Sequence, residues 1–173
     1  MEQKVTTPIV KGLVITLILI IYGLILYFSG QFMNKGLSYS QYIILVGGVI
    51  WSCTSYAKQM KGKVTFGNVF AHGFKTTAVI ILLVVVYTFI SIKFLFPDMI
   101  DKIVDASRKS MEEQKNMSDE QIDSFLNGMR EHFLLFTTSI IILLFAIVGL
   151  IASLIGAAVS KKNPPNPFAQ QQM

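Results

Sequence analysis

Long uncharged apolar runs limit what this chain can fold into. Residues 12–34 and 132–160 contain no Asp, Glu, Lys or Arg, and residues 13–28 read LVITLILIIYGLILYF. Each run reaches the roughly 20 residues that an α-helix needs to cross the hydrocarbon core of a bilayer. Only 14% of the residues are charged, whereas soluble domains are about 25% charged. We therefore expect an integral membrane protein.

The apolar runs predict an all-α protein built as a four-helix transmembrane bundle. The spans are expected at about residues 12–30, 39–57, 75–96 and 132–160. A cleaved signal peptide is the alternative for the first run, but no A-x-A-like site follows Phe28, so we favour an uncleaved span. Residues 1–162 are expected to form one integral membrane domain. Residues 163–173, with several prolines and a QQQ run, are expected to be a flexible cytoplasmic tail.

One sizeable polar segment, residues 97–131, separates the third and fourth spans. It holds nine acidic and five basic residues. Its apolar residues have helical spacing, and Ser118 with Gln121 has the pattern of a capping box, so we expect a helical hairpin. A metal site is the alternative reading of Asp119, Glu120 and Asp123. Acids in the first turn of a helix are better explained by the helix dipole, and we predict no metal ion.

Four lysines between the second and third spans set the expected orientation: Lys58, Lys61, Lys63 and Lys75. Short basic segments beside apolar spans stay in the cytoplasm. The N-terminal flank and the C-terminal flank each add two lysines, whereas acids outnumber bases in residues 97–131. We therefore predict an inner-membrane protein with both termini cytoplasmic and an extracytoplasmic hairpin.

The segment that follows these lysines leaves two questions open. Phe66, Phe70 and Phe74 share one helical face, which fits either a short helix lying in the membrane interface or an extension of the third span. His72 is either a proton-responsive or ligand-contacting group, or a histidine that caps or hydrogen-bonds at an interfacial turn.

Small residues four apart mark candidate helix contacts, because they let two helices approach closely. The candidates are Gly47, Gly48, Gly149, Ser153 and Gly156. Cys53, the single cysteine, lies inside an apolar run and is expected to be an inert packing residue.

No motif for catalysis or cofactor binding occurs in the sequence, so we expect neither enzyme activity nor a cofactor. The lysines sit at the ends of apolar runs and form no long basic face, which argues against nucleic-acid binding. The spans are almost free of ionisable groups, and Lys93 is close enough to a span end to reach the interface. We expect a structural or accessory protein that contacts the lipid bilayer and a membrane-protein partner or a second copy. The alternative is a small channel or transporter subunit that acts as an oligomer.

Three short motifs flank the predicted second, third and fourth spans. They are Gly62 with Thr65-Phe66-Gly67, Phe70, Gly73 and Phe74; Met117-Ser118-Asp119-Glu120-Gln121-Ile122; and Lys161-Lys162-Asn163. In these motifs the chain resembles a four-span membrane family that is frequent in Bacteroidetes-type bacteria and is known only as a domain of unknown function. The resemblance implies a bacterial inner-membrane location and supplies no catalytic residue.

The orientation can be tested by labelling introduced cysteines in intact cells. A membrane-impermeant maleimide should react with a Met111→Cys variant, because residues 97–131 are predicted to be extracytoplasmic. The same reagent should leave a Lys61→Cys variant unlabelled until the cells are lysed. The opposite pattern would reverse the predicted orientation.

Overall fold

A computed structural model describes residues 5–114 and 117–163, and this part of the chain is helical without strands. The helices are α1 (Pro8–Phe28), α2 (Lys35–Gln59), α3 (Phe66–Ile90), the π-helix η1 (Ser91–Leu95), α4 (Met99–Gln114), α5 (Asp119–Glu131) and α6 (Phe133–Val159). The all-α prediction is therefore confirmed. The predicted tail at residues 163–173 lies outside the described residues, apart from Asn163.

Three helices of the described chain are long and apolar enough to cross a membrane, whereas the sequence predicted four. They are Pro8–Phe28, Phe66–Leu95 and Phe133–Val159. The second predicted span, residues 39–57, lies within α2, which is outside this set. Ser, Gln and Thr side chains are interspersed along α2 and dilute its apolar character. The structure thus confirms that the protein is helical, but it supports three membrane spans among the described residues and not four.

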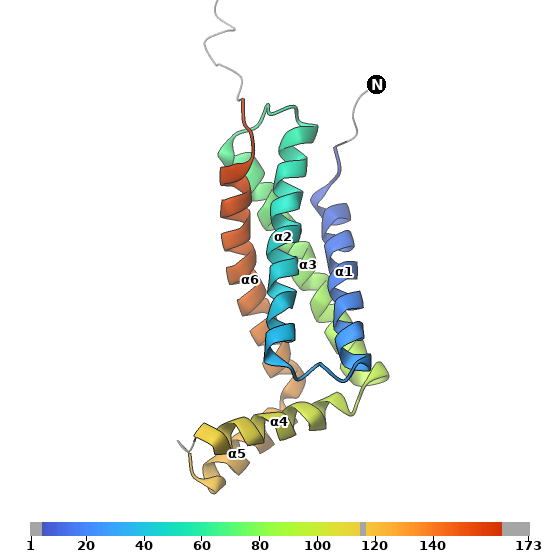
Figure 1. Ribbon diagram of the computed structural model, residues 1–173, viewed down its shortest axis with the longest axis vertical. Helices are drawn as coiled ribbons and strands as arrows, with labels where there is room; N and C mark the ends of the chain where they lie inside the picture. The colour runs from blue at the N-terminus through green and yellow to red at the C-terminus, as the bar shows by residue number, and fades with distance from the viewer. Residues whose placement is uncertain (1–4, 115–116, 164–173) are drawn as a thin grey trace, which may run out of the picture. The chain divides into compact units, whose positions relative to one another are not determined.

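The chain divides into two compact units, and the first comprises residues 1–83 and 144–173. Within this unit α1, α2, the start of α3 and the end of α6 lie side by side (Figure 1). Their shared interior is aliphatic and almost inaccessible, each residue being 2% exposed or less: Ile15, Leu19, Leu45, Val49 and Ile80.

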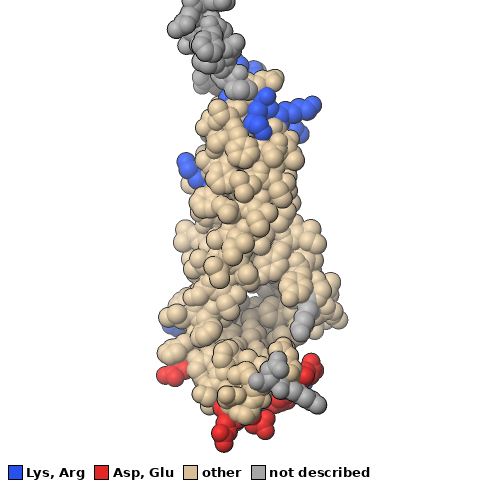
Figure 2. Space-filling view, turned by 90° about the vertical axis from the view of Figure 1, so that its left-hand side faces the viewer, with Lys and Arg blue, Asp and Glu red and all other residues tan. Residues whose placement is uncertain are grey.

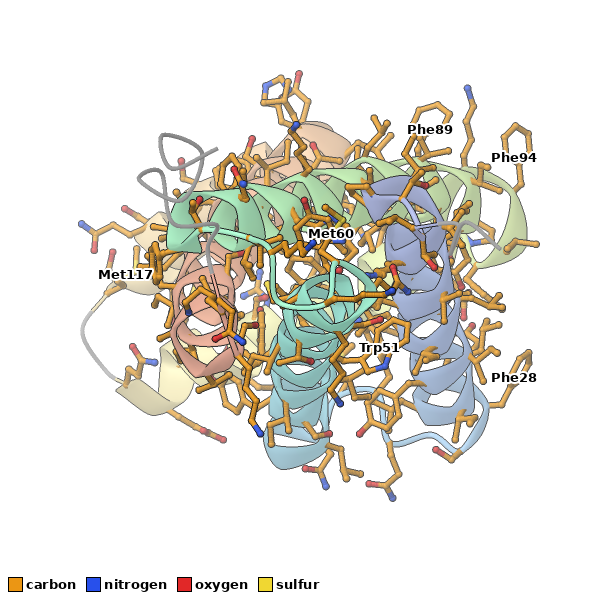
Figure 3. All side chains as sticks on the ribbon, turned by 90° about the horizontal axis from the view of Figure 1, so that it is seen from above. Phe28, Trp51, Met60, Phe89, Phe94 and Met117 are labelled. Carbon is orange, nitrogen blue, oxygen red and sulfur yellow. The ribbon has the colours of Figure 1, made fainter. Side chains whose placement is uncertain are left out.

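The outward surface of α1 is as apolar as this interior. Leu17 and Ile25 are each 58% exposed, and Phe28 projects away from the neighbouring helices (Figure 3). The polar residues Lys11 and Thr16 are buried instead. This is the reverse of a soluble helix, whose polar side faces water. It indicates a surface made for hydrocarbon.

The connections in the first unit are short and capped. Thr7 caps α1 through Val10 N–H, and Asn34 accepts hydrogen bonds from the first free amides of α2. The linker between them is residues 29–34, so α2 begins before residue 39, where the second span was predicted. Helix α3 continues without a break from Phe66, and residues 66–74 therefore extend the third span instead of forming a separate interfacial helix.

The second unit, residues 84–143, contains the predicted helical hairpin of α4 and α5. The two helices enclose a small core of Val104, Ile122 and Leu126. Ser118 and Gln121 form the predicted capping box at the start of α5. The acidic side chains lie on the surface of this hairpin (Figure 2). Two ion pairs join the helices, Asp101 with Arg130 and Asp123 with Arg108. Because all four side chains are exposed, these pairs fix the register of the hairpin more than its stability.

The second unit also contains the π-helix η1. Phe96 N–H donates to the carbonyl of Ser91 at 2.7 Å, five residues back, so this turn holds one residue more than an α-helical turn. Lys93 Nζ lies 5.4 Å from the ring centroid of Phe89 and 5.9 Å from that of Phe94. These are cation–π distances, which hold the ammonium beside the aromatic rings at the end of the apolar run.

The hairpin core can be tested by removing one side chain. Leu126→Ala should weaken the hairpin by about 2 kcal/mol, the lower end for a buried leucine, because a two-helix core relaxes easily. Amide hydrogen exchange across α5 should then accelerate roughly 30-fold. Asn127→Ala, at the next and exposed position, is the matched control and should leave the exchange rates unchanged. Equal rates in both variants would contradict the hairpin core.

Candidate functional site

A buried lysine is the most unusual feature of the first unit. Lys11 lies in the first turns of α1, and only 1% of it is exposed. A lysine is almost never fully buried unless its charge is paired. Yet residues 3–97 and 132–173 of the sequence contain no Asp or Glu. Lys11 is therefore held by neutral groups.

Two groups from neighbouring helices receive the Lys11 ammonium. Its Nζ donates to the main-chain carbonyl of Ser52 on α2 at 3.1 Å. It lies 3.4 Å from Nε2 of His72, which is on α3 and 6% exposed. The side chain of Lys11 on α1 thus makes polar contacts with both α2 and α3.

Aromatic and hydroxyl side chains complete this cluster, which we call the Lys11 cluster: Lys11, Ser52, Tyr56, His72 and Thr76. The ring of Tyr56 stacks on the imidazole of His72, with centroids 4.2 Å apart and an interplanar angle of 9°. The Lys11 Nζ lies 6.0 Å from the Tyr56 ring centroid. Ser52 Oγ and Thr76 Oγ1 are 2.9 Å apart, and Thr76 Oγ1 donates to the His72 carbonyl. The imidazole is therefore held on one face by a ring and at one edge by an ammonium.

In the structure, His72 does not lie at an interfacial turn. Helix α3 begins at Phe66, and His72 lies within it with its side chain turned inward. The inward position and the contact with Lys11 favour the reading of His72 as a proton-responsive group over that of a histidine at an interfacial turn.

The Lys11 cluster lies towards one end of the unit, and the interior next to it is apolar. Gln59 and Thr6 hydrogen-bond to each other at the same end, through Thr6 N–H and the Gln59 side chain. On the other side of the cluster, Ile15, Leu19 and Ile80 fill the interior. The hydroxyl of Thr16 is buried there and has no hydrogen-bond partner among the described residues. Beyond the cluster, the buried polar groups of this interior are single hydroxyls, such as those of Thr16, Thr77 and Ser153.

Most of the small-residue candidates lie at contacts inside the first unit. A Cβ on Gly48 would lie 2.9 Å from Ile15, and one on Gly156 would lie 2.7 Å from Cys53. A Cβ on Gly149 would overlap Thr77 of α3. Ser153 is buried and lies against Gly73, whose own Cβ would collide with the Cys53 thiol. The seam on α6 is thus used within the chain.

Gly47 is different, because a Cβ there would meet nothing within 4 Å. It is exposed on α2, next in sequence to Val46, which lines an open apolar groove of about 410 Å³. The other lining residues are Tyr42, Ile43, Val148 and Ile151. This surface therefore lies along α2 and α6, where Tyr42 also contacts the ring of Phe145.

The four lysines assigned to orientation are all exposed: Lys58, Lys61, Lys63 and Lys75. Lysine side chains gather at the end of the first unit that carries the α2–α3 loop (Figure 2). Lys61 adopts a positive φ of 52° and Gly62 one of 76°, which form the tight turn of this loop.

The sequence did not indicate that Lys11 is buried or that Gly73 lies at a helix contact. Lys11 was read as a flanking charge, since a lysine at the start of a span normally reaches the interface. One signal was present: Lys11, Ile15 and Leu19 are spaced by four and share the buried face of α1. In a helix that is apolar all round, however, that face cannot be recognised from hydrophobic periodicity.

Together, the fold and these contacts define an α-helical integral membrane protein with an ionisable pair in its interior. The chain belongs to the family described as "Protein of unknown function (DUF4199)", whose match covers residues 11–162. The resemblance drawn from the three sequence motifs is thereby confirmed as family membership. No curated protein and no solved structure matches the chain.

The internal helix contacts can be tested with two matched glycine substitutions. Gly149→Ala should lower the unfolding temperature in detergent by about 4 °C or more, since overpacking costs about 1–3 kcal/mol. Gly47→Ala should leave it unchanged or raise it, because alanine favours a helix and meets no neighbour. A thiol-reactive dye can follow unfolding through Cys53, the only cysteine and fully buried. An equal effect of the two substitutions would contradict the placement of the α6 seam.

Proposed function

We propose that this protein is a non-enzymatic, multi-pass membrane protein with a structural or accessory role. The observation that carries the proposal is the closed interior of the first unit. Beyond the Lys11 cluster, most buried side chains between the helices are aliphatic, and the buried hydroxyls of Thr77 and Ser153 donate to carbonyls of their own helices. Moving a polar solute across a membrane requires polar groups along its path. A single chain packed in this way supports neither a transport route nor an active-site cleft.

We include α2 as a fourth span in this proposal. Gly48 of α2 contacts α1, and Cys53 contacts both Gly73 of α3 and Gly156 of α6. A helix with three helical neighbours can carry polar side chains inward, as Ser52 does at 0% exposure. Low apolarity is then compatible with crossing the bilayer. Four spans place both termini on one side, and the lysine-rich end favours the cytoplasm of a bacterial inner membrane.

In this arrangement the two polar regions would make different contacts. The lysine-rich end would lie among anionic lipid headgroups, which attract such clusters. The hairpin of α4 and α5 would project into the extracytoplasmic space. Its acidic surface and its paired helices would offer a binding surface for a partner protein. Lipid contact by the lysines and partner contact by the hairpin would suit an accessory subunit.

An oligomeric channel or transporter subunit is the second candidate. It needs a surface for a second copy, and the seam with Gly149 and Gly156 is already occupied by Thr77 and Cys53. The exposed Gly47 beside the apolar groove is a small-residue site that favours this candidate.

Reconstitution into liposomes separates the two candidates. Vesicles that contain the full-length protein and a pH-sensitive dye should retain a proton gradient as long as protein-free vesicles do. They should also show no increase in potassium leak. Gramicidin added at the end provides the positive control. Proton or ion flux above the protein-free rate would reject the accessory role and favour the oligomeric channel.

A further inference from the structure

The contact between Lys11 and His72 is the strongest feature that the accessory role leaves unused. An ammonium group has only donors, so it can bond to His72 only if Nε2 carries no proton. The 3.4 Å distance between Nζ and Nε2 fits an ammonium that donates to the unprotonated Nε2 of a neutral imidazole. This state holds one proton more than the fully neutral pair.

A second proton would turn this contact into a repulsion. Both nitrogens would then be donors carrying positive charge, in an interior where charges are weakly screened. No Asp or Glu occurs among the described residues of the first unit, so no carboxylate there offsets the two charges. Ser52 supplies a carbonyl to Lys11 alone. The pair thus accommodates one charge and excludes two.

An anion is the other ligand that a buried lysine could take, and the geometry argues against it. Lys11 is 1% exposed and already donates to the Ser52 carbonyl and lies against the imidazole. The atoms that face Nζ are the Ser52 carbonyl oxygen and Nε2 of His72. Both act as hydrogen-bond acceptors, and acceptors do not bind an anion. A proton fits the site without added volume.

We propose that Lys11 and His72 form a one-proton site, and that loading a second proton separates α1 from α2 and α3 at this end of the unit. The contact connects three helices, since Lys11 reaches Ser52 on α2 and His72 on α3. If Lys11 Nζ moves away from His72, α1 loses its polar contacts with Ser52 on α2 and with His72 on α3. The packing of α1 would then report the pH on this side of the membrane.

Other ionisable groups near the pair are few. On α2 they are the Tyr56 phenol, whose ring stacks on His72, the buried Cys53 thiol and exposed Lys58. On α3 the nearest is Lys75, which is exposed, and α6 carries no ionisable side chain between Phe133 and Val159. Exposed lysine and ordinary tyrosine keep their protonation state between pH 5 and pH 8, and a buried thiol stays protonated there. Lys11 and His72 are therefore the groups that can change the charge of this site in that range.

The first measurement is the unfolding temperature of the full-length protein in detergent, followed by the fluorescence of Trp51. An imidazole in the unfolded chain takes up a proton near pH 6.5, whereas the folded pair resists the second proton. The wild-type unfolding temperature should therefore fall between pH 8 and pH 5. The fall should exceed that of His72→Gln by roughly 4 °C. Lys11→Met, which leaves a single base, should show a smaller fall than the wild type.

The second measurement identifies which imidazole nitrogen carries the proton. In a His132→Gln background, ¹⁵N-labelled histidine gives a signal from His72 alone. At pH 8 the wild-type pair should show a proton on Nδ1 and none on Nε2. Lys11→Met should lose this preference. A role in packing alone would not change the tautomer, so this readout separates the proposal from a purely structural contact.

Two controls complete the experiment. Tyr56→Phe keeps the stacked ring and should preserve the pH dependence. Glu2→Gln should also preserve it, because the proposal assigns the proton to His72. An undiminished fall in His72→Gln, a fall abolished by Glu2→Gln, or a wild-type Nε2–H tautomer would each overturn the proposal. If His72→Gln does not fold, His72→Phe keeps a ring against Tyr56 and takes its place.

Discussion

The structure depends on the exclusion of water from both the interior and the outward surface of the first unit. Hydrocarbon offers no hydrogen bonds, so each polar group must find its partner inside the protein. Ser153 and Thr77 accordingly donate to carbonyls one turn back on their own helices, those of Gly149 and Gly73. Lys11 follows the same rule across three helices. Away from the lysine-rich end, the outward positions are apolar, and the charged Lys11 side chain lies among neutral groups in the interior.

This constraint explains how much of the fold could be predicted from the sequence. Runs of apolar residues identify spans because hydrocarbon thickness sets their length, and α6 at Phe133–Val159 differs from the predicted 132–160 by one residue at each end. The capping box at Ser118 was equally visible, because it is a local pattern. Helix α2 was harder, since Ser52 and other polar residues lower its apolar character although it packs among three helices. Lys11 and His72 are 61 positions apart, and no local rule indicates which faces of two uniformly apolar helices will meet.

Small residues give the first unit its close packing and also limit its options. Thr77 packs against Gly149 and Cys53 packs against Gly156, so α6 has little small-residue surface left for other helices. The same contacts draw α2 and α3 together around the Lys11 cluster, so the tight seam and the polar cluster support one another. Membership of the family explains neither feature, because its description carries no function. Any role assigned to these residues has to come from their contacts.

The π-turn at Ser91–Leu95 has a consequence for the history of the chain. A regular α-helix turns by about 100° per residue, so one inserted residue would rotate every later side chain off its face. A five-residue turn absorbs such an insertion locally. Helix α3 before it can then keep its lipid-facing and inward-facing sides while the chain length changes by one. A single residue could thus be gained or lost in this short segment without changing which side chains of the membrane helix face the lipid.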